Sequence, residues 1–256
     1  MIQAGPIWRV VVLGAAAVLL LAGLGSLDAD APDEPRALQI AEELRSGEHG
    51  LAGLVVLHLN GEVYTQKPPL YYWLAAAAGA PAGHVSEGAA RLPSALAGIA
   101  VVALTLLLGT RMLGSGAGVL GAALLLTSYE FVWLARRVQF DVLLTFFELA
   151  ALASFWWLDR GMGGARRHQA TLHAALGLAV LTKGPVGFLI PALTIVEPET
   201  PHPIPEVVMR LRFALCTVAL VAGLAPAASA QGPAPDQPDM VVDAATRKAV
   251  VDTLAE

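Results

Sequence analysis

The chain alternates between long apolar runs and polar connections. About 20 apolar residues in a helix cross the hydrocarbon core of a bilayer. Runs of about this length lie at residues 8–27, 92–113, 117–135, 142–158 and 172–193. Lys183-Gly184-Pro185 interrupts the last of them, and proline lacks the amide donor that a continuous helix needs. We therefore predict two half-length segments that meet near Lys183, in an all-α fold that forms a polytopic transmembrane helical bundle.

The longest hydrophilic stretch between these runs covers residues 28–90. Within it, residues 33–44 predict an amphipathic helix that lies along the membrane surface. Its apolar residues recur at the spacing of one helix face: Ala37, Ile40, Ala41 and Leu44. Asp30 is the expected cap of this helix. The aromatic residues at 71–73 suit the belt at a membrane interface.

Composition narrows the class further. Hydrophobic residues make up 56% of the 256 positions and charged residues 14%, well below the quarter or so that soluble domains carry. A net charge of −5 argues against a nucleic-acid partner. Cys216 is the single cysteine, so a disulfide within the chain is excluded, and the six histidines show no metal-ligand spacing. Counting basic residues does not settle the orientation, although the basic loop at 160–167 favours the inside.

Five short strings occur in a fixed order along the chain. They read PDEPRALQIAEELRSGE from residue 32, YTQKPPLYYWL from 64, EGAARLPSAL from 87, RRVQFDVLLTFF from 136 and LTKGPVGFLIPAL from 181. In this order and spacing they resemble the aminoarabinose-transferase and protein O-mannosyltransferase group, membrane enzymes of the GT-C fold. The resemblance covers about residues 7–195.

The resemblance implies a glycosyltransferase that takes its sugar from a polyprenyl-phosphate lipid. The acceptor would be a hydroxyl or phosphate group on a lipid or protein. The enzyme would be a multi-pass protein of the inner (plasma) membrane, with its active site on the periplasmic or extracytoplasmic side. Members of the group are considerably longer, so we expect the chain as it stands to be an incomplete enzyme without turnover.

The resemblance also implies roles for particular residues. The catalytic candidates are the acids Asp33 and Glu34, because the group places an acid in the first extracytoplasmic loop, where it can act as general base on the acceptor hydroxyl. A departing lipid phosphate needs positive charge nearby. The substrate-binding candidates are Arg36, Tyr64, Lys67, Asp141 and Lys183. The group commonly has Glu where this chain has Gln66, a poorer ligand for a divalent cation, so we expect no metal and no other cofactor.

Each candidate also has a purely structural interpretation. Asp33 and Glu34 suit the first turn of any helix, and Lys67 can serve as an anchor at the interface. Asp141 can cap a helix. Lys183 is harder to explain structurally, because a charge inside an apolar run is costly.

Other charged residues receive no catalytic role. Arg136 and Arg137 are expected to be flanking anchors. Glu130 and Glu148 are expected to face the interior of the bundle.

The end of the chain differs from the first 195 residues. Residues 196–208 form a proline-rich linker, and residues 209–230 have the basic start, apolar core and Ala-Ser-Ala end of a signal peptide. Residues 231–256 are expected to be mostly disordered with one short helix, and they weakly resemble the start of an exported hydrolase. Two alternative functions stay open: a non-catalytic polytopic membrane protein or transporter fragment, and the misjoined leader of an exported hydrolase.

Overall fold

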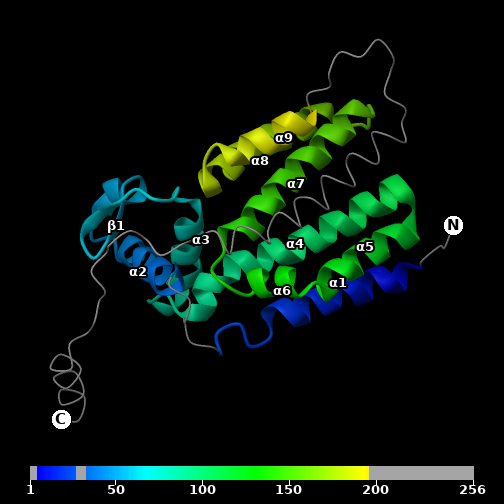
Figure 1. Cartoon of the computed structure of the whole chain (residues 1–256). Helices are drawn as coiled ribbons and strands as arrows, with labels where there is room; N and C mark the ends of the chain where they lie inside the picture. The colour runs from blue at the N-terminus through cyan, green and yellow to red at the C-terminus, as the bar shows by residue number, and fades with distance from the viewer. Residues whose placement is uncertain (1–4, 27–32, 196–256) are drawn as a thin grey trace. The chain divides into compact units, whose positions relative to one another are not determined.

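The structure, a computed structural model, describes residues 5–26 and 33–195. The predictions for residues 196–256 and the expected cap at Asp30 lie outside the described residues. The elements, in chain order, are α1 (Pro6–Leu21), α2 (Asp33–Ser46), η1 (Gly50–Leu54), β1 (Leu57–Leu59), β2 (Glu62–Tyr64), α3 (Leu70–Gly79), η2 (Ala80–Ala82), α4 (Glu87–Leu113), α5 (Ser115–Thr127), α6 (Tyr129–Ala135), α7 (Phe140–Asp159), α8 (Ala165–Lys183) and α9 (Val186–Ile195). Apart from one short hairpin these are helices, which confirms the predicted fold class (Figure 1).

Two of the described helices are long and apolar enough to cross a bilayer unbroken, namely α4 with 27 residues and α7 with 20. The predicted run at 117–135 is not straight, because Ser128 has an extended backbone and α5 meets α6 there at 72°. This pair is either a broken span or a re-entrant loop. The 16 residues of α1 fall short of the predicted run. The chain is thus an integral membrane protein.

The predicted break at Lys183 is present. α8 ends at Lys183, Gly184 follows with a φ of 80°, and α9 begins at Val186. The first of the two segments is longer than expected, since α8 starts at Ala165 and has 19 residues. The break places the lysine at the end of a helix rather than in the middle of one.

α4 is the helix around which the others pack. It contacts α1, α3, α5, α6 and α7, and Figure 1 shows α1, α4 and α5 side by side. Small residues permit this close packing, as is common where lipid is the solvent. A Cβ at Gly109 would lie 2.7 Å from the Cα of Gly118, and a Cβ at Gly98 would lie 2.9 Å from the Cβ of Ala135.

The extramembrane part is formed by α2, the β1–β2 hairpin and α3. The apolar face of α2 is buried as the pattern predicts, with Ala37, Ile40 and Ala41 almost inaccessible. It packs against α3 and β1, so this face is covered by protein, and the expectation that the helix lies along the membrane surface stays a prediction. Strand β1 pairs antiparallel with β2, and the turn at Asn60-Gly61 uses the left-handed backbone that a tight hairpin requires.

The expected aromatic belt at residues 71–73 is wrong for both tyrosines. Tyr71 and Tyr72 are 0% and 2% exposed, because α3 packs between α2 and α4. Trp73 keeps partial exposure and donates from its indole nitrogen to the Leu54 carbonyl oxygen at 2.8 Å. The sequence could not separate the two cases, because an aromatic residue after a Pro-Pro pair is equally compatible with a membrane interface and with a protein core.

The contact between α4 and α5 leads to a stability prediction. A Cβ at Gly118 would lie 2.6 Å from the backbone oxygen of Leu106 and the backbone nitrogen of Thr110. We expect Gly118→Ala to lower the free energy of unfolding in mixed micelles by about 1–3 kcal/mol, since overpacking forces the helices apart. Gly14→Ala is the matched control, because a Cβ there meets nothing within 4 Å. Equal stability of the two variants would contradict the close α4–α5 contact.

Candidate active site

The first turn of α2 places an acid between two cations. Arg36 Nη1 donates to Asp33 Oδ1 at 3.1 Å, as residues three apart on a helix can. Lys67 Nζ lies 3.9 Å from the other carboxylate oxygen of Asp33. Asp33 and Lys67 each keep 28% of their side-chain surface exposed. The carboxylate is therefore held by cations and still open to a substrate.

Lys67 is held over an aromatic ring in the loop before α3. Its ammonium lies 4.7 Å from the ring centroid of Phe140, a cation–π contact. Burial lowers the pKa of Lys67, and the negative charge of Asp33 opposes that change. The ammonium also lies within the electrostatic reach of three further predicted site residues: Lys183, Asp141 and Arg36.

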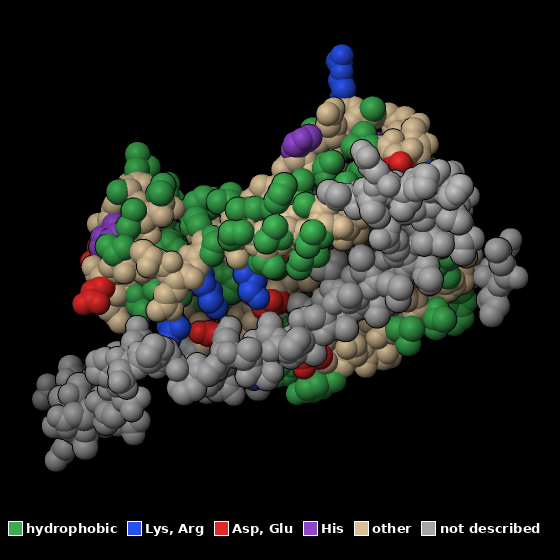
Figure 2. Space-filling view, turned by 45° about the horizontal axis from the view of Figure 1, so that its top comes forward, with side chains coloured by type: hydrophobic (Ala, Val, Ile, Leu, Met, Phe, Trp, Pro, Cys, Tyr) green, Lys and Arg blue, Asp and Glu red, His purple; other side chains and the backbone are tan. Residues whose placement is uncertain are grey.

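Asp141 and Lys183 complete the cluster from the membrane side. Asp141 lies in the first turn of α7 and Lys183 in the last turn of α8, two helices that pack extensively. The lysine ammonium donates to Asp141 Oδ1. Their side chains are 16% and 34% exposed. Figure 2 shows basic and acidic side chains gathered beside one another on an otherwise hydrophobic face.

Tyr64 borders this cluster through a second tyrosine. Tyr64 is 8% exposed, and its hydroxyl accepts from the Tyr72 hydroxyl at 3.5 Å. Burial raises the pKa of Tyr72, so this phenol stays protonated and able to donate. The Tyr72 ring in turn packs edge-on against Phe140.

Sequence reasoning missed the roles of Tyr72 and Phe140. Both lie in the ordered strings, Tyr72 five residues after Lys67 and Phe140 directly before Asp141. Their closeness in sequence to these two predicted site residues was the one indication of a role in the site. Their aromatic character pointed instead to a membrane interface or a helix core.

Glu34, the second catalytic candidate, is placed differently. It is 1% exposed, and its two oxygens accept from Arg91 Nε at 3.1 Å and Arg91 Nη2 at 2.9 Å. The Val138 amide donates to it at 2.8 Å, and Arg137 lies 3.7 Å away. Arg137, expected to be only an anchor, therefore takes part in a buried ion pair. A catalytic role for Glu34 stays a prediction, but its contacts hold α2 against α4 and the connection before α7.

Glu148 confirms the expectation that it faces the interior. It is 1% exposed on α7. Within residues 5–26 and 33–195, neither of its carboxylate oxygens has a hydrogen-bond partner. The charges of Lys183 and Asp141 act on it, so it lies within electrostatic reach of the site.

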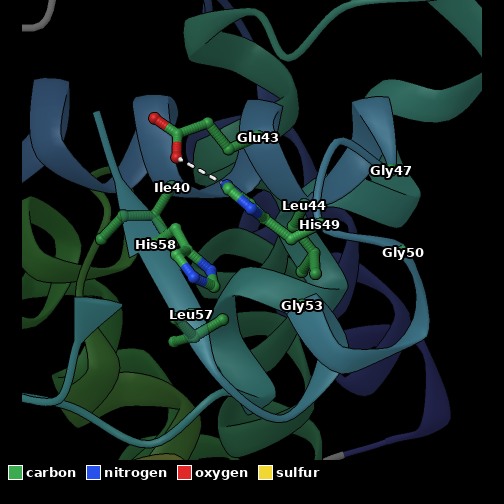
Figure 3. Close-up of a pocket in the computed structure, with 9 residues that line it drawn as sticks. All are labelled: Ile40, Glu43, Leu44, Gly47, His49, Gly50, Gly53, Leu57 and His58. Atoms are coloured by element: carbon green, nitrogen blue, oxygen red, sulfur yellow. Dashed lines mark ion pairs between the residues drawn. The ribbon is translucent and has the colours of Figure 1, made fainter. Parts of the chain in front are cut away.

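A second polar pocket lies in the extramembrane part (Figure 3). The rings of His49 and His58 stack with centroids 3.6 Å apart, and His49 Nε2 lies 3.8 Å from Glu43 Oε2. The cavity has a volume of about 10 Å³, room for one water. Glu43 also accepts from the Asn60 amide at 2.7 Å, which fixes the hairpin turn to α2.

The structure does not test the expectation that the protein binds no divalent metal. Gln66 is exposed, and among the described residues no three acidic, histidine or cysteine side chains converge as metal ligands. That the protein uses no cofactor stays a prediction.

The described residues thus form an apolar helical bundle with an acid and two lysines clustered at its edge. The chain belongs to the dolichyl-phosphate-mannose-protein mannosyltransferase family, whose model matches residues 31–197. This confirms the family that the ordered strings indicated.

Relatives and solved structures agree with this assignment. The chain is 30% identical over 164 residues to an undecaprenyl phosphate-alpha-4-amino-4-deoxy-L-arabinose arabinosyl transferase of Pseudomonas savastanoi pv. phaseolicola, covering 63% of this chain and 30% of that protein. ArnT from Cupriavidus metallidurans in the apo state superposes with a TM-score of 0.67 at 26% identity, over 86% of this chain and 40% of that one. The same protein bound to undecaprenyl phosphate gives 0.69 at 23% identity, over 90% and 43%. The chain thus spans less than half of each.

The buried ion pair gives a prediction that separates two adjacent acids. Glu34→Gln removes the buried carboxylate charge that accepts from Arg91 and from the Val138 amide, and we expect it to lower the free energy of unfolding by about 1–3 kcal/mol. Asp33→Asn breaks only a partly exposed pair, so about 0–1 kcal/mol is expected. Chemical unfolding of both variants in mixed micelles makes the comparison. A Glu34→Gln protein as stable as wild type would show that the pair does not hold α2.

Proposed function

We propose that this protein transfers a sugar from a polyprenyl-phosphate donor to an acceptor hydroxyl or phosphate group at the extracytoplasmic face of the inner membrane. One observation carries the proposal: an accessible carboxylate, Asp33, lies 3.9 Å from the Lys67 ammonium in a cluster that also includes Lys183. Such a cluster supplies a base for the acceptor and cations for a phosphate in one place.

The chemistry divides between these groups. Asp33 accepts the proton of the acceptor hydroxyl, whose oxygen attacks the anomeric carbon of the sugar. The bond between that carbon and the phosphate oxygen breaks, and the electron pair leaves with the lipid phosphate. Lys67 and Lys183 stabilise the charge that develops on this phosphate. Arg36 orients Asp33 through their hydrogen bond.

The two tyrosines and the acid on α7 support this arrangement. Tyr64 and Tyr72 offer hydroxyls at the edge of the cluster. Asp141 holds Lys183 at the end of α8. Without Asp141, an ammonium that close to the bilayer would be costly.

The partners follow from the family and from the membrane location. A relative is named for undecaprenyl phosphate, and a structural neighbour was solved with that lipid bound. A polyprenyl-phosphate sugar is accordingly the proposed donor, and a lipid or a protein the proposed acceptor. Nucleic acid is not a proposed partner, given the net charge of −5.

Replacing the proposed base tests the assignment directly. We expect Asp33→Asn to lower kcat by about 100-fold or more, as loss of a general base does, and to leave donor binding nearly unchanged. Lys67→Ala and Lys183→Ala should instead weaken donor binding about tenfold each. Transfer is measured in native membranes that carry the product of the complete gene, because the chain as it stands is expected to be without turnover, and binding is measured by titration with polyprenyl phosphate. Full turnover by Asp33→Asn would exclude Asp33 as the base.

The lowered pKa of Lys67 predicts a pH dependence. Its pKa lies below the ordinary value of 10.5, so the positive charge is lost at a lower pH than for an exposed lysine. As pH rises through that value, kcat/KM for the donor should fall, because an uncharged amine binds phosphate poorly. Lys67→Arg should move the fall to higher pH, since arginine stays protonated. If kcat/KM for the donor falls at the same alkaline pH in wild type and in Lys67→Arg, the charge of Lys67 does not contribute to donor binding.

A further inference from the structure

The residue before α7 is held by a side chain of another helix. Gln139 is the extended residue that precedes α7, and no side chain of its own caps the helix. Its amide donates to Ser94 Oγ at 3.1 Å, and the Ser94 hydroxyl lies 3.0 Å from the Gln139 carbonyl oxygen. One hydroxyl on α4 therefore contacts both backbone polar groups of a residue 45 positions away.

A second hydroxyl fixes the first. The Tyr71 hydroxyl lies 2.7 Å from Ser94 Oγ and donates to the Ala90 carbonyl oxygen at 3.0 Å. Tyr71 and Ser94 are both 0% exposed. Water therefore cannot replace these contacts, and a buried polar group that loses its partner is destabilised. The Tyr71 ring also packs on Phe140, with centroids 4.7 Å apart.

The residues that directly follow Gln139 belong to the site. Phe140 lies under the Lys67 ammonium, and Asp141 binds Lys183. A rotation or shift of the start of α7 would move both contacts together. The Thr145 hydroxyl does not prevent it, because it donates to the Asp141 carbonyl oxygen within its own helix.

We propose that Ser94 and Tyr71 are positioning residues, which hold the start of α7 so that Phe140 and Asp141 place the two lysines around the donor phosphate. This inference rests on the proposed function for its catalytic consequence. The geometric consequence, the placement of the lysines, can be measured separately.

The three lysines of the chain, at 67, 183 and 248, make that measurement practicable. Reductive methylation with ¹³C-formaldehyde labels their amines, and Lys67→Arg and Lys183→Arg assign the resonances. We expect Ser94→Ala to shift both site resonances, because the start of α7 carries the ring and the carboxylate that face the two ammonium groups. Tyr71→Phe, which keeps the ring, should cause a smaller shift in the same direction.

Controls separate positioning from a general loss of stability. Thr105→Val removes a hydroxyl from the same helix that has no partner among the described residues, and it should leave the lysine resonances unchanged. Ser94→Thr retains the hydroxyl and should restore them. The double variant Ser94→Ala/Tyr71→Phe should be less than additive, because both changes break one network.

Kinetics supply the second readout. Ser94→Ala should raise the donor KM about tenfold while kcat changes less, because phosphate binding is affected more than the chemical step. Lysine resonances in Ser94→Ala that match wild type would overturn the inference, whatever the enzyme transfers. A second outcome separates the two proposals. If Ser94→Ala shifts the lysine resonances but the wild-type protein binds no polyprenyl phosphate, Ser94 does position the lysines, and the proposed function is refuted instead.

Discussion

The buried contact between Glu34 and Arg91 determines where the rest of the site can lie. Both side chains are almost fully removed from solvent, where separating the charges is very costly. The pair fixes the first turn of α2 against α4, a helix that is long and apolar enough to cross a bilayer. Since Asp33 is the preceding residue on α2, its direction follows from the position of Glu34. The exposed acid can then be available for chemistry because its buried neighbour holds the helix.

The same logic applies at the start of α7. There the Ser94 hydroxyl, which Tyr71 contacts, binds Gln139, and the next two residues contact Lys67 and Lys183. In both places a buried polar contact is adjacent in sequence to a partly exposed charged residue of the site. Both contacts involve the first turns of α4, so this helix end supports acid and cations together. Buried contacts that hold the helices, next to exposed charges that can bind a ligand, suit a site that must bind a charged lipid headgroup and keep its geometry.

Much of the fold could be predicted from the sequence because lipid imposes simple requirements. The apolar runs located α4 and α7, and Gly184-Pro185 located the end of α8. The one-sided spacing of Ala37, Ile40 and Ala41 located α2. What covers that face could not be predicted, since α3 and the hairpin pack on it through contacts distant in sequence. The bend at Ser128 was also missed, because a polar residue within an apolar run is compatible with a straight helix.

For the site, the order of the strings indicated Asp33, Lys67 and Lys183, and the structure brings the first two into contact. The different roles of neighbouring residues were harder to predict. Asp33 and Glu34 are both first-turn acids in the sequence, and only the partner 57 positions away shows that Glu34 is buried. Tyr72 looked like part of an interfacial aromatic belt, and the role of Phe140 was not visible because a cation–π contact leaves no periodic signal in the sequence.

The central claim is that Asp33, Lys67 and Lys183 surround one phosphate-binding space. A cryo-EM structure of the protein with polyprenyl phosphate bound tests it most directly. The account predicts the phosphate within hydrogen-bond distance of both lysine ammonium groups, with the Asp33 carboxylate facing the same space. A phosphate bound elsewhere, with both lysines still paired only to Asp33 and Asp141, would contradict it.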